Sequence, residues 1–118
     1  MATLEQLARI ETILREWHEA GRARFERDCP TLDYDGESYQ KHHHVGAKYI
    51  RLDAGHSGCF MVEIASGLVF EIKGYGVPNR RKIAGVAWEP AFHGSTLERV
   101  RYSRGSYDYR KGDMDGPR

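Results

Sequence analysis

The fold is decided by residues 57–73, which read Ser-Gly-Cys-Phe-Met-Val-Glu-Ile-Ala-Ser-Gly-Leu-Val-Phe-Glu-Ile-Lys. Apolar residues alternate with their neighbours on both sides of the central Ala-Ser-Gly, and this period of two is typical of β-strands. The Ala-Ser-Gly segment is short enough for a tight hairpin connection. We therefore predict two antiparallel strands whose alternating apolar residues share one face of the sheet. These residues are Phe60, Val62, Ile64, Leu68, Phe70 and Ile72.

The N-terminal segment, residues 1–28, has the period of a helix. Its apolar side chains recur at steps of three and four residues and form one stripe, made of Leu7, Ile10, Ile13, Leu14 and Trp17. Thr3 and Gln6 have the spacing of a capping box, which predicts where the helix begins, and Pro30 predicts its end. We expect the stripe to cover the sheet, because so small a domain needs that buried apolar area.

The remaining segments complete a single domain, residues 1–118. Residues 30–47, which include His42, His43 and His44, are predicted to form a loop, and residues 48–103 to hold the sheet. Within that range, 97–102 is favoured as a strand, although Ser95 and Glu98 have the spacing to cap a short helix. Residues 112–118 are expected to be frayed. We therefore predict an α+β fold: a long N-terminal helix packed on a mostly antiparallel sheet of four to five strands.

Length and composition exclude several classes of protein. The chain has 118 residues and an aromatic content of 11%, which favours one globular domain over a disordered chain or a multidomain enzyme. No apolar run approaches the roughly 18 residues of a membrane span, and the N-terminus lacks the order of a signal peptide. We expect a soluble cytoplasmic protein with no membrane partner. Two reduced thiols are then the simpler interpretation of Cys29 and Cys59, although their spacing does not exclude a disulfide between them.

The net charge of +1 conceals an uneven distribution. Residues 1–40 carry five Arg and nine Asp or Glu, whereas residues 41–118 carry thirteen Lys or Arg and eight Asp or Glu. The excess is strongest over residues 73–112, where nine Lys or Arg accompany three Asp or Glu. This pattern is typical either of ordinary solubility or of a basic face for an anionic partner.

The strongest candidate site lies in that basic region. Arginine binds phosphate through a two-pronged guanidinium, and tyrosine rings stack on bases. This combination predicts an anionic ligand, above all nucleic acid. The alternative is a solvated sheet edge whose cations prevent aggregation. The candidate ligand-binding residues are Lys73, Tyr75, Arg80, Arg81, Lys82, Arg99, Arg101 and Tyr102.

Other motifs are weaker. Gly74-x-Gly76-x-x-Asn79 lacks the third glycine of a dinucleotide loop and is better explained by a turn. The three consecutive histidines could bind a metal with His56 or Asp53, but neighbours on an extended segment point to opposite sides. Cys59 lies near His56 in sequence, yet it fits better as a packed apolar group than as a nucleophile. The sequence thus predicts no enzyme, no cofactor and no metal site.

Two segments carry a resemblance to a known group of proteins. Ser57-Gly-Cys-Phe-Met-Val-Glu63, followed by Ser66-Gly-Leu-Val-Phe-Glu-Ile-Lys-Gly-Tyr-Gly-Val-Pro-Asn-Arg-Arg-Lys82, resembles a segment shared by small uncharacterised proteins encoded by bacteriophages and prophages. The resemblance covers about a third of the chain, and it leaves out the helix and the histidines. It implies an accessory phage protein, of a kind that blunts a host defence, and it implies no chemistry.

These observations lead to three hypotheses for a non-enzymatic protein. The preferred one is an accessory binding protein that grips nucleic acid. The second is a protein–protein inhibitor of a host defence complex, anti-CRISPR-like or of another anti-defence type, which uses acidic residues as a nucleic-acid mimic. Those residues are Glu11, Glu16, Glu19, Glu26, Asp28, Asp33 and Asp35. The third is sequestration of a nucleotide signal in a pocket lined by Tyr75, Arg81 and Trp88.

Overall fold

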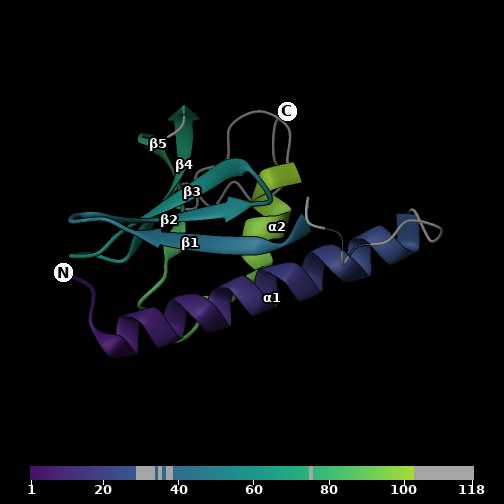
Figure 1. Ribbon diagram of the computed structural model, residues 1–118, viewed down its shortest axis with the longest axis horizontal. Coiled ribbons are helices and arrows are strands. Elements are labelled where there is room, and N and C mark those ends of the chain that lie inside the picture. Colours follow the sequence, from purple (N-terminus) through teal and green to yellow (C-terminus); the bar gives the residue numbers. More distant parts are fainter. Residues whose placement is uncertain (29–33, 35, 37–38, 75, 103–118) are drawn as a thin grey trace.

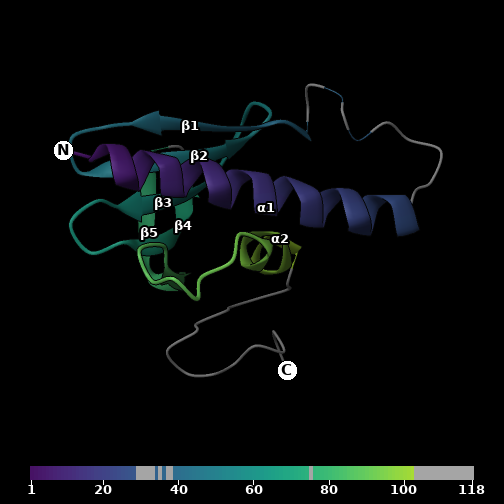
Figure 2. The same cartoon turned by 90° about the horizontal axis from the view of Figure 1, so that it is seen from below.

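The computed structural model describes residues 1–28, 34, 36, 39–74 and 76–102, and it confirms the α+β fold. A five-stranded sheet has the strand order β1-β2-β3-β4-β5, with every neighbouring pair antiparallel (Figure 1). Helix α1 runs along one face of the sheet, and α2 lies beside α1 (Figure 2). The elements are α1 (Leu4–Asp28), β1 (Lys41–Val45), β2 (Tyr49–Ala54), β3 (Ser57–Glu63), β4 (Leu68–Gly74), β5 (Val77–Val86) and α2 (Ser95–Tyr102).

Helix α1 begins with the predicted capping box. The Gln6 amide N–H donates to the Thr3 hydroxyl at 3.1 Å, and the Thr3 amide N–H donates to the Gln6 side-chain oxygen at 3.0 Å. The predicted stripe is buried except for Leu7, which is partly buried, and the Trp17 ring packs edge-on against Phe60 with centroids 5.4 Å apart. Each large apolar side chain buried in this way contributes about 1.5–3 kcal/mol to folding. The prediction that the stripe covers the sheet is therefore confirmed.

The predicted pairing of apolar sets in β3 and β4 is wrong by one residue. Val62 pairs with Val69, and both are buried under α1. Phe70 pairs instead with Met61, so it lies on the opposite face of the sheet. Because side chains alternate along a strand, a shift of one residue moves a whole set to the other face. The set that includes Val69 also contains Glu71 and Lys73, so hydropathy favoured the other set, Leu68, Phe70 and Ile72, for the face under α1.

The face of the sheet away from α1, called the open face below, has its own small apolar cluster. Met61, Phe70 and Ile83 are linked by their strand pairings and are no more than 5% exposed. The Arg80 guanidinium lies 4.7 Å from the centroid of the Phe70 ring, and the Tyr49 ring meets Phe70 edge-on. A basic and an aromatic residue thus cover this cluster.

Two predicted boundaries need correction. Part of the predicted loop, residues 30–47, is strand β1, which pairs with β2 from Lys41↔Ala54 to Val45↔Ile50. The sequence does not reveal this strand, because His42, His43 and His44 have the same polarity. They lie on alternating faces of β1, but no apolar–polar alternation marks it. Residues 29–33 and the expected frayed tail, 112–118, lie outside the described residues.

Residues 97–102, favoured as a strand, belong to helix α2. Leu97 and Val100 are buried three residues apart, which is helical spacing, and they pack in the core with α1. Gly94 precedes the helix and packs so closely on α1 that a Cβ would contact the Trp17 backbone nitrogen at 2.8 Å. The alternation of Val100 and Tyr102 therefore misled the sequence analysis, and the Ser95–Glu98 capping alternative marked the correct element.

Neither helix described here is both long and apolar enough to cross a membrane.

Candidate functional site

The predicted basic hairpin is formed by β4 and β5, but its central arginine is engaged within the fold. The two terminal nitrogens of Arg80 each lie 3.4 Å from a Glu63 carboxylate oxygen, and one of them donates to the Tyr49 hydroxyl at 2.7 Å. The Ser66 hydroxyl and then the Arg80 charge lower the pKa of Glu63. Arg80 therefore stabilises the open face of the sheet, in addition to any role in binding.

The other hairpin cations are less constrained. Lys73 and Arg81 are exposed, and Lys82 is half-buried. Burial raises the pKa of Glu71, and the charge of Lys82 opposes that effect. Lys82 thus compensates for a half-buried carboxylate, whereas Lys73 and Arg81 remain available to solvent.

The arginines of α2 do not join this hairpin. Arg99 and Arg101 are exposed, and Arg101 is close enough to Lys41 of β1 and Cys59 of β3 to influence their pKa values. Since β1 and β5 are opposite edges of the sheet, the Lys41 that Arg101 influences lies at the edge opposite to the hairpin strand β5. Neither predicted stacking ring can be placed. Tyr75 and the side chain of Tyr102 both lie outside the described part of the chain.

The acidic helix is partly neutralised by its own arginines. Arg15 pairs with Glu19, and Asp28 pairs with Arg24. Glu16 accepts a hydrogen bond from the Gly94 amide at 2.8 Å. Asp33 and Asp35 are outside the described residues. These contacts leave less free negative charge for a nucleic-acid mimic than the sequence suggests.

The residues predicted to line a nucleotide pocket can be placed only in part. Trp88 donates its indole N–H to the Ile64 carbonyl oxygen at 2.9 Å, and it lines a cavity with residues of α1 and with Pro90. Arg81 is not among the residues that line this cavity. The third predicted member, Tyr75, belongs to the part of the chain that is not described.

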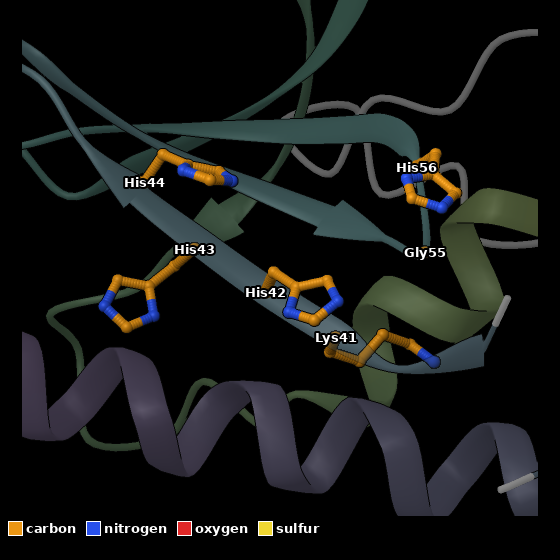
Figure 3. Close-up of a pocket in the computed structure, with 6 residues that line it drawn as sticks. All are labelled: Lys41, His42, His43, His44, Gly55 and His56. Carbon is orange, nitrogen blue, oxygen red and sulfur yellow. The ribbon is translucent and has the colours of Figure 1, made fainter. Parts of the chain in front are cut away.

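The histidine strand β1 borders a cavity of about 500 Å³, called the histidine cavity below. His43 and His44 lie on opposite sides of the strand, and His56 approaches from the turn between β2 and β3 (Figure 3). The lining residues are Lys41, His42, His43, His44, Gly55 and His56. These side chains offer imidazole nitrogens and one ammonium group, with no carboxylate among them.

A second cavity of about 280 Å³ continues from His44 around the turn between β1 and β2. We call it the turn groove. It lies at the open face and is bordered on its far side by Gly76, at the end of the β4–β5 hairpin. The lining residues are His44, Val45, Gly46, Ala47, Lys48, Tyr49, Arg51, Met61 and Gly76. The two cavities adjoin at His44, and together we call them the band; neither is lined by an aspartate or a glutamate.

A buried carboxylate lies beneath this band. Asp53 is 4% exposed, and one of its oxygens lies 3.6 Å from His44 Nε2 and 3.8 Å from a terminal nitrogen of Arg51. The other oxygen has no hydrogen-bond partner among the described residues. His42 is the cross-strand partner of Asp53 in the register of β1 and β2. Asp53 therefore holds His44 and Arg51 in place and reduces the positive potential of the band.

The weaker sequence candidates can also be placed. His42 and His44 do share a face with Asp53, as the alternation of a strand requires, but no three described metal-ligating side chains are positioned to hold an ion. Cys59 is a free thiol that packs beside the core. Burial raises the pKa of the Cys59 thiol, which disfavours the nucleophilic thiolate. Gly76 has a φ of 78°, which supports the turn explanation of the glycine motif.

Sequence analysis missed Lys48, Tyr49 and Arg51 as site residues. They lie at the start of a predicted strand, and nothing in their spacing distinguishes them from ordinary strand residues. The signal that was available was Val45-Gly46-Ala47-Lys48, a small-residue turn between a polar segment and a strand, which would have paired β1 with β2.

No protein family, curated protein or solved structure matches the chain.

Proposed function

We propose that the protein is a non-enzymatic binding protein that holds nucleic acid along the band formed by the histidine cavity and the turn groove. The observation that carries this proposal is the composition of the band. Its lining includes Lys41, Lys48, Arg51 and four histidines, with no carboxylate. A surface of this kind attracts a phosphate backbone, because cations of the protein replace the counterions of the nucleic acid.

The turn groove contributes a second kind of contact. The Tyr49 hydroxyl accepts a hydrogen bond from Arg80, which fixes the ring at the groove. A ring held in place stacks on a base at a smaller entropic cost than a free one, and each stacked base contributes about 1–3 kcal/mol. Because the cations contact phosphates rather than base edges, we expect affinity with little sequence preference.

The biological setting of this proposal follows from the sequence resemblance. We propose an accessory protein of phage type that acts in the cytoplasm of the bacterial host. Its ligand is then nucleic acid that the host defence or the phage itself exposes.

Binding of a labelled single-stranded oligonucleotide, measured by fluorescence anisotropy between 50 and 200 mM salt, tests the proposal. Two phosphate contacts, from Lys48 and Arg51, predict a slope of about −1.4 for the logarithm of affinity against the logarithm of salt concentration. Lys48→Gln is expected to lower affinity about three- to tenfold and to reduce the slope by about 0.7. Lys73→Gln, which removes the same charge from the hairpin, serves as the matched control and is expected to change affinity less than twofold.

Two results would reject the proposal. One is binding that does not weaken as salt rises, since phosphate contacts require that dependence. The other is an equal loss of affinity in Lys48→Gln and Lys73→Gln, which would show that overall charge, rather than the band, attracts the ligand.

A further inference from the structure

The amine of Lys41 has an unusual environment, because neutral and aromatic groups surround it. Its Nζ donates to the Tyr39 carbonyl oxygen at 2.6 Å and to the Tyr34 hydroxyl at 3.1 Å, and it lies 3.5 Å from His18 Nδ1. The same nitrogen is 5.1 Å from the centroids of both the Trp17 and Tyr34 rings. The amine therefore lies between the sheet and α1 within an aromatic cluster.

This environment does not supply the negative charge that a buried ammonium needs. No described carboxylate forms an ion pair with Lys41. The charged or titratable groups that act on it from a distance are Glu98 and Arg101 of α2 and Cys59 of β3. Burial lowers the pKa of Lys41 to about 8; Glu98 opposes this effect and Arg101 adds to it. At pH 8 about half of such an amine is unprotonated, compared with less than about 1% of an ordinary lysine.

The lysine is also accessible. Lys41 is only partly buried and lines the histidine cavity of about 500 Å³, which opens to solvent. Figure 3 shows the Lys41 side chain beside the His42 ring, with its amine well separated from the rings of His43 and His44. A small electrophile that enters from solvent can therefore approach the nitrogen.

We propose that Lys41 is a modification site for activated acyl compounds, such as acyl phosphates or thioesters. The nitrogen lone pair attacks the acyl carbonyl carbon, and a new C–N bond forms. The bond to the leaving group breaks with its electron pair, so the phosphate or thiolate departs, and the amine proton passes to solvent or to the leaving group. The product is a neutral amide, which removes the cation that the Trp17 and Tyr34 rings face.

Competitive acetylation of the full chain tests this proposal. The protein is treated with limiting acetyl phosphate between pH 7 and 10, and mass spectrometry gives the rate at each lysine. At pH 8 we expect Lys41 to react about tenfold faster than the exposed Lys48, because a larger free-amine fraction outweighs its lower basicity and partial burial. Its rate should reach half its maximum near pH 8. A Lys41 rate below that of Lys48 throughout pH 7–9 would overturn the proposal.

Two exposed arginines of α2 provide a matched pair of variants. Arg101→Gln removes a cation that lowers the pKa of Lys41, so we expect its acetylation profile to move to higher pH. Arg99→Gln removes the same charge from the same helix and should leave the profile unchanged. Identical profiles for the wild type and both variants would contradict the proposed electrostatic control. Thermal unfolding of each variant verifies that the fold is retained.

Discussion

The hairpin at one edge of the sheet and the strand pair at the other are both rich in cations, but the fold uses those cations differently. On the β4–β5 hairpin, Arg80 forms an ion pair with Glu63 and a hydrogen bond to Tyr49. The charge of Lys82 lowers the pKa of Glu71, against the effect of burial. At the β1–β2 turn, Lys48 is exposed and lines the turn groove, and the carboxylate nearest to it, that of Glu63, is already paired with Arg80. The number of cations in a segment therefore does not locate a binding surface. The position of the carboxylates decides which cations remain available to a ligand.

The largest effect expected from this comparison is a loss of stability on the hairpin side. Arg80→Ala removes a partly exposed ion pair, a hydrogen bond to Tyr49 and the contact with the Phe70 ring. Together these are expected to lower the free energy of unfolding by about 1–2 kcal/mol. Urea denaturation followed by circular dichroism measures the change.

Lys48→Ala is the counterpart for that measurement. Its side chain is exposed and forms no hydrogen bond or ion pair with the described residues, so we expect a change of less than about 0.5 kcal/mol. Should Lys48→Ala destabilise the protein as much as Arg80→Ala does, the distinction between a structural hairpin and an available turn would fail.

The sequence predicted the framework of the fold better than the site, and particular residues explain why. The capping pair Thr3 and Gln6 and the stripe through Trp17 follow from local spacing, and both are confirmed. The face of Phe70 depends on cross-strand register, which is a property of two segments together. The engagement of Arg80 by Glu63 joins residues 17 positions apart, so no local pattern contains it.

The strand β1 illustrates the same limit for the candidate site. Its three histidines have no hydropathy contrast, and its identity as a strand depends on pairing with Ile50–Ala54. Only after that pairing do His44, Lys48 and Arg51 lie along one band. Side-chain chemistry was visible in the sequence, whereas its assembly required the three-dimensional register.

A smaller effect is expected from the carboxylate beneath the band. Asp53→Asn keeps the shape of the side chain but removes the negative charge beside His44 and Arg51. The positive potential of the band rises, and we expect oligonucleotide affinity at low salt to increase about threefold. Fluorescence anisotropy measures the change, and Glu71→Gln, the same charge change on the hairpin, is the control. A weaker complex with Asp53→Asn, in a protein that still unfolds cooperatively, would count against the band.

The smallest effect concerns Glu71 itself and tests whether its half-buried charge lowers the stability of the fold. Burial raises the pKa of Glu71 in the folded protein above its unfolded value, so the ionised side chain destabilises the fold at neutral pH. Glu71→Gln removes that cost and is expected to raise the free energy of unfolding at pH 7 by roughly 0.5 kcal/mol, a value reduced for the partial exposure of the group. The gain should disappear as pH falls below about 4, where the wild-type carboxyl is protonated in both states. Denaturation of both proteins at pH 7 and pH 4 measures it, and a gain of equal size at both pH values would show that packing, rather than the buried charge, is responsible.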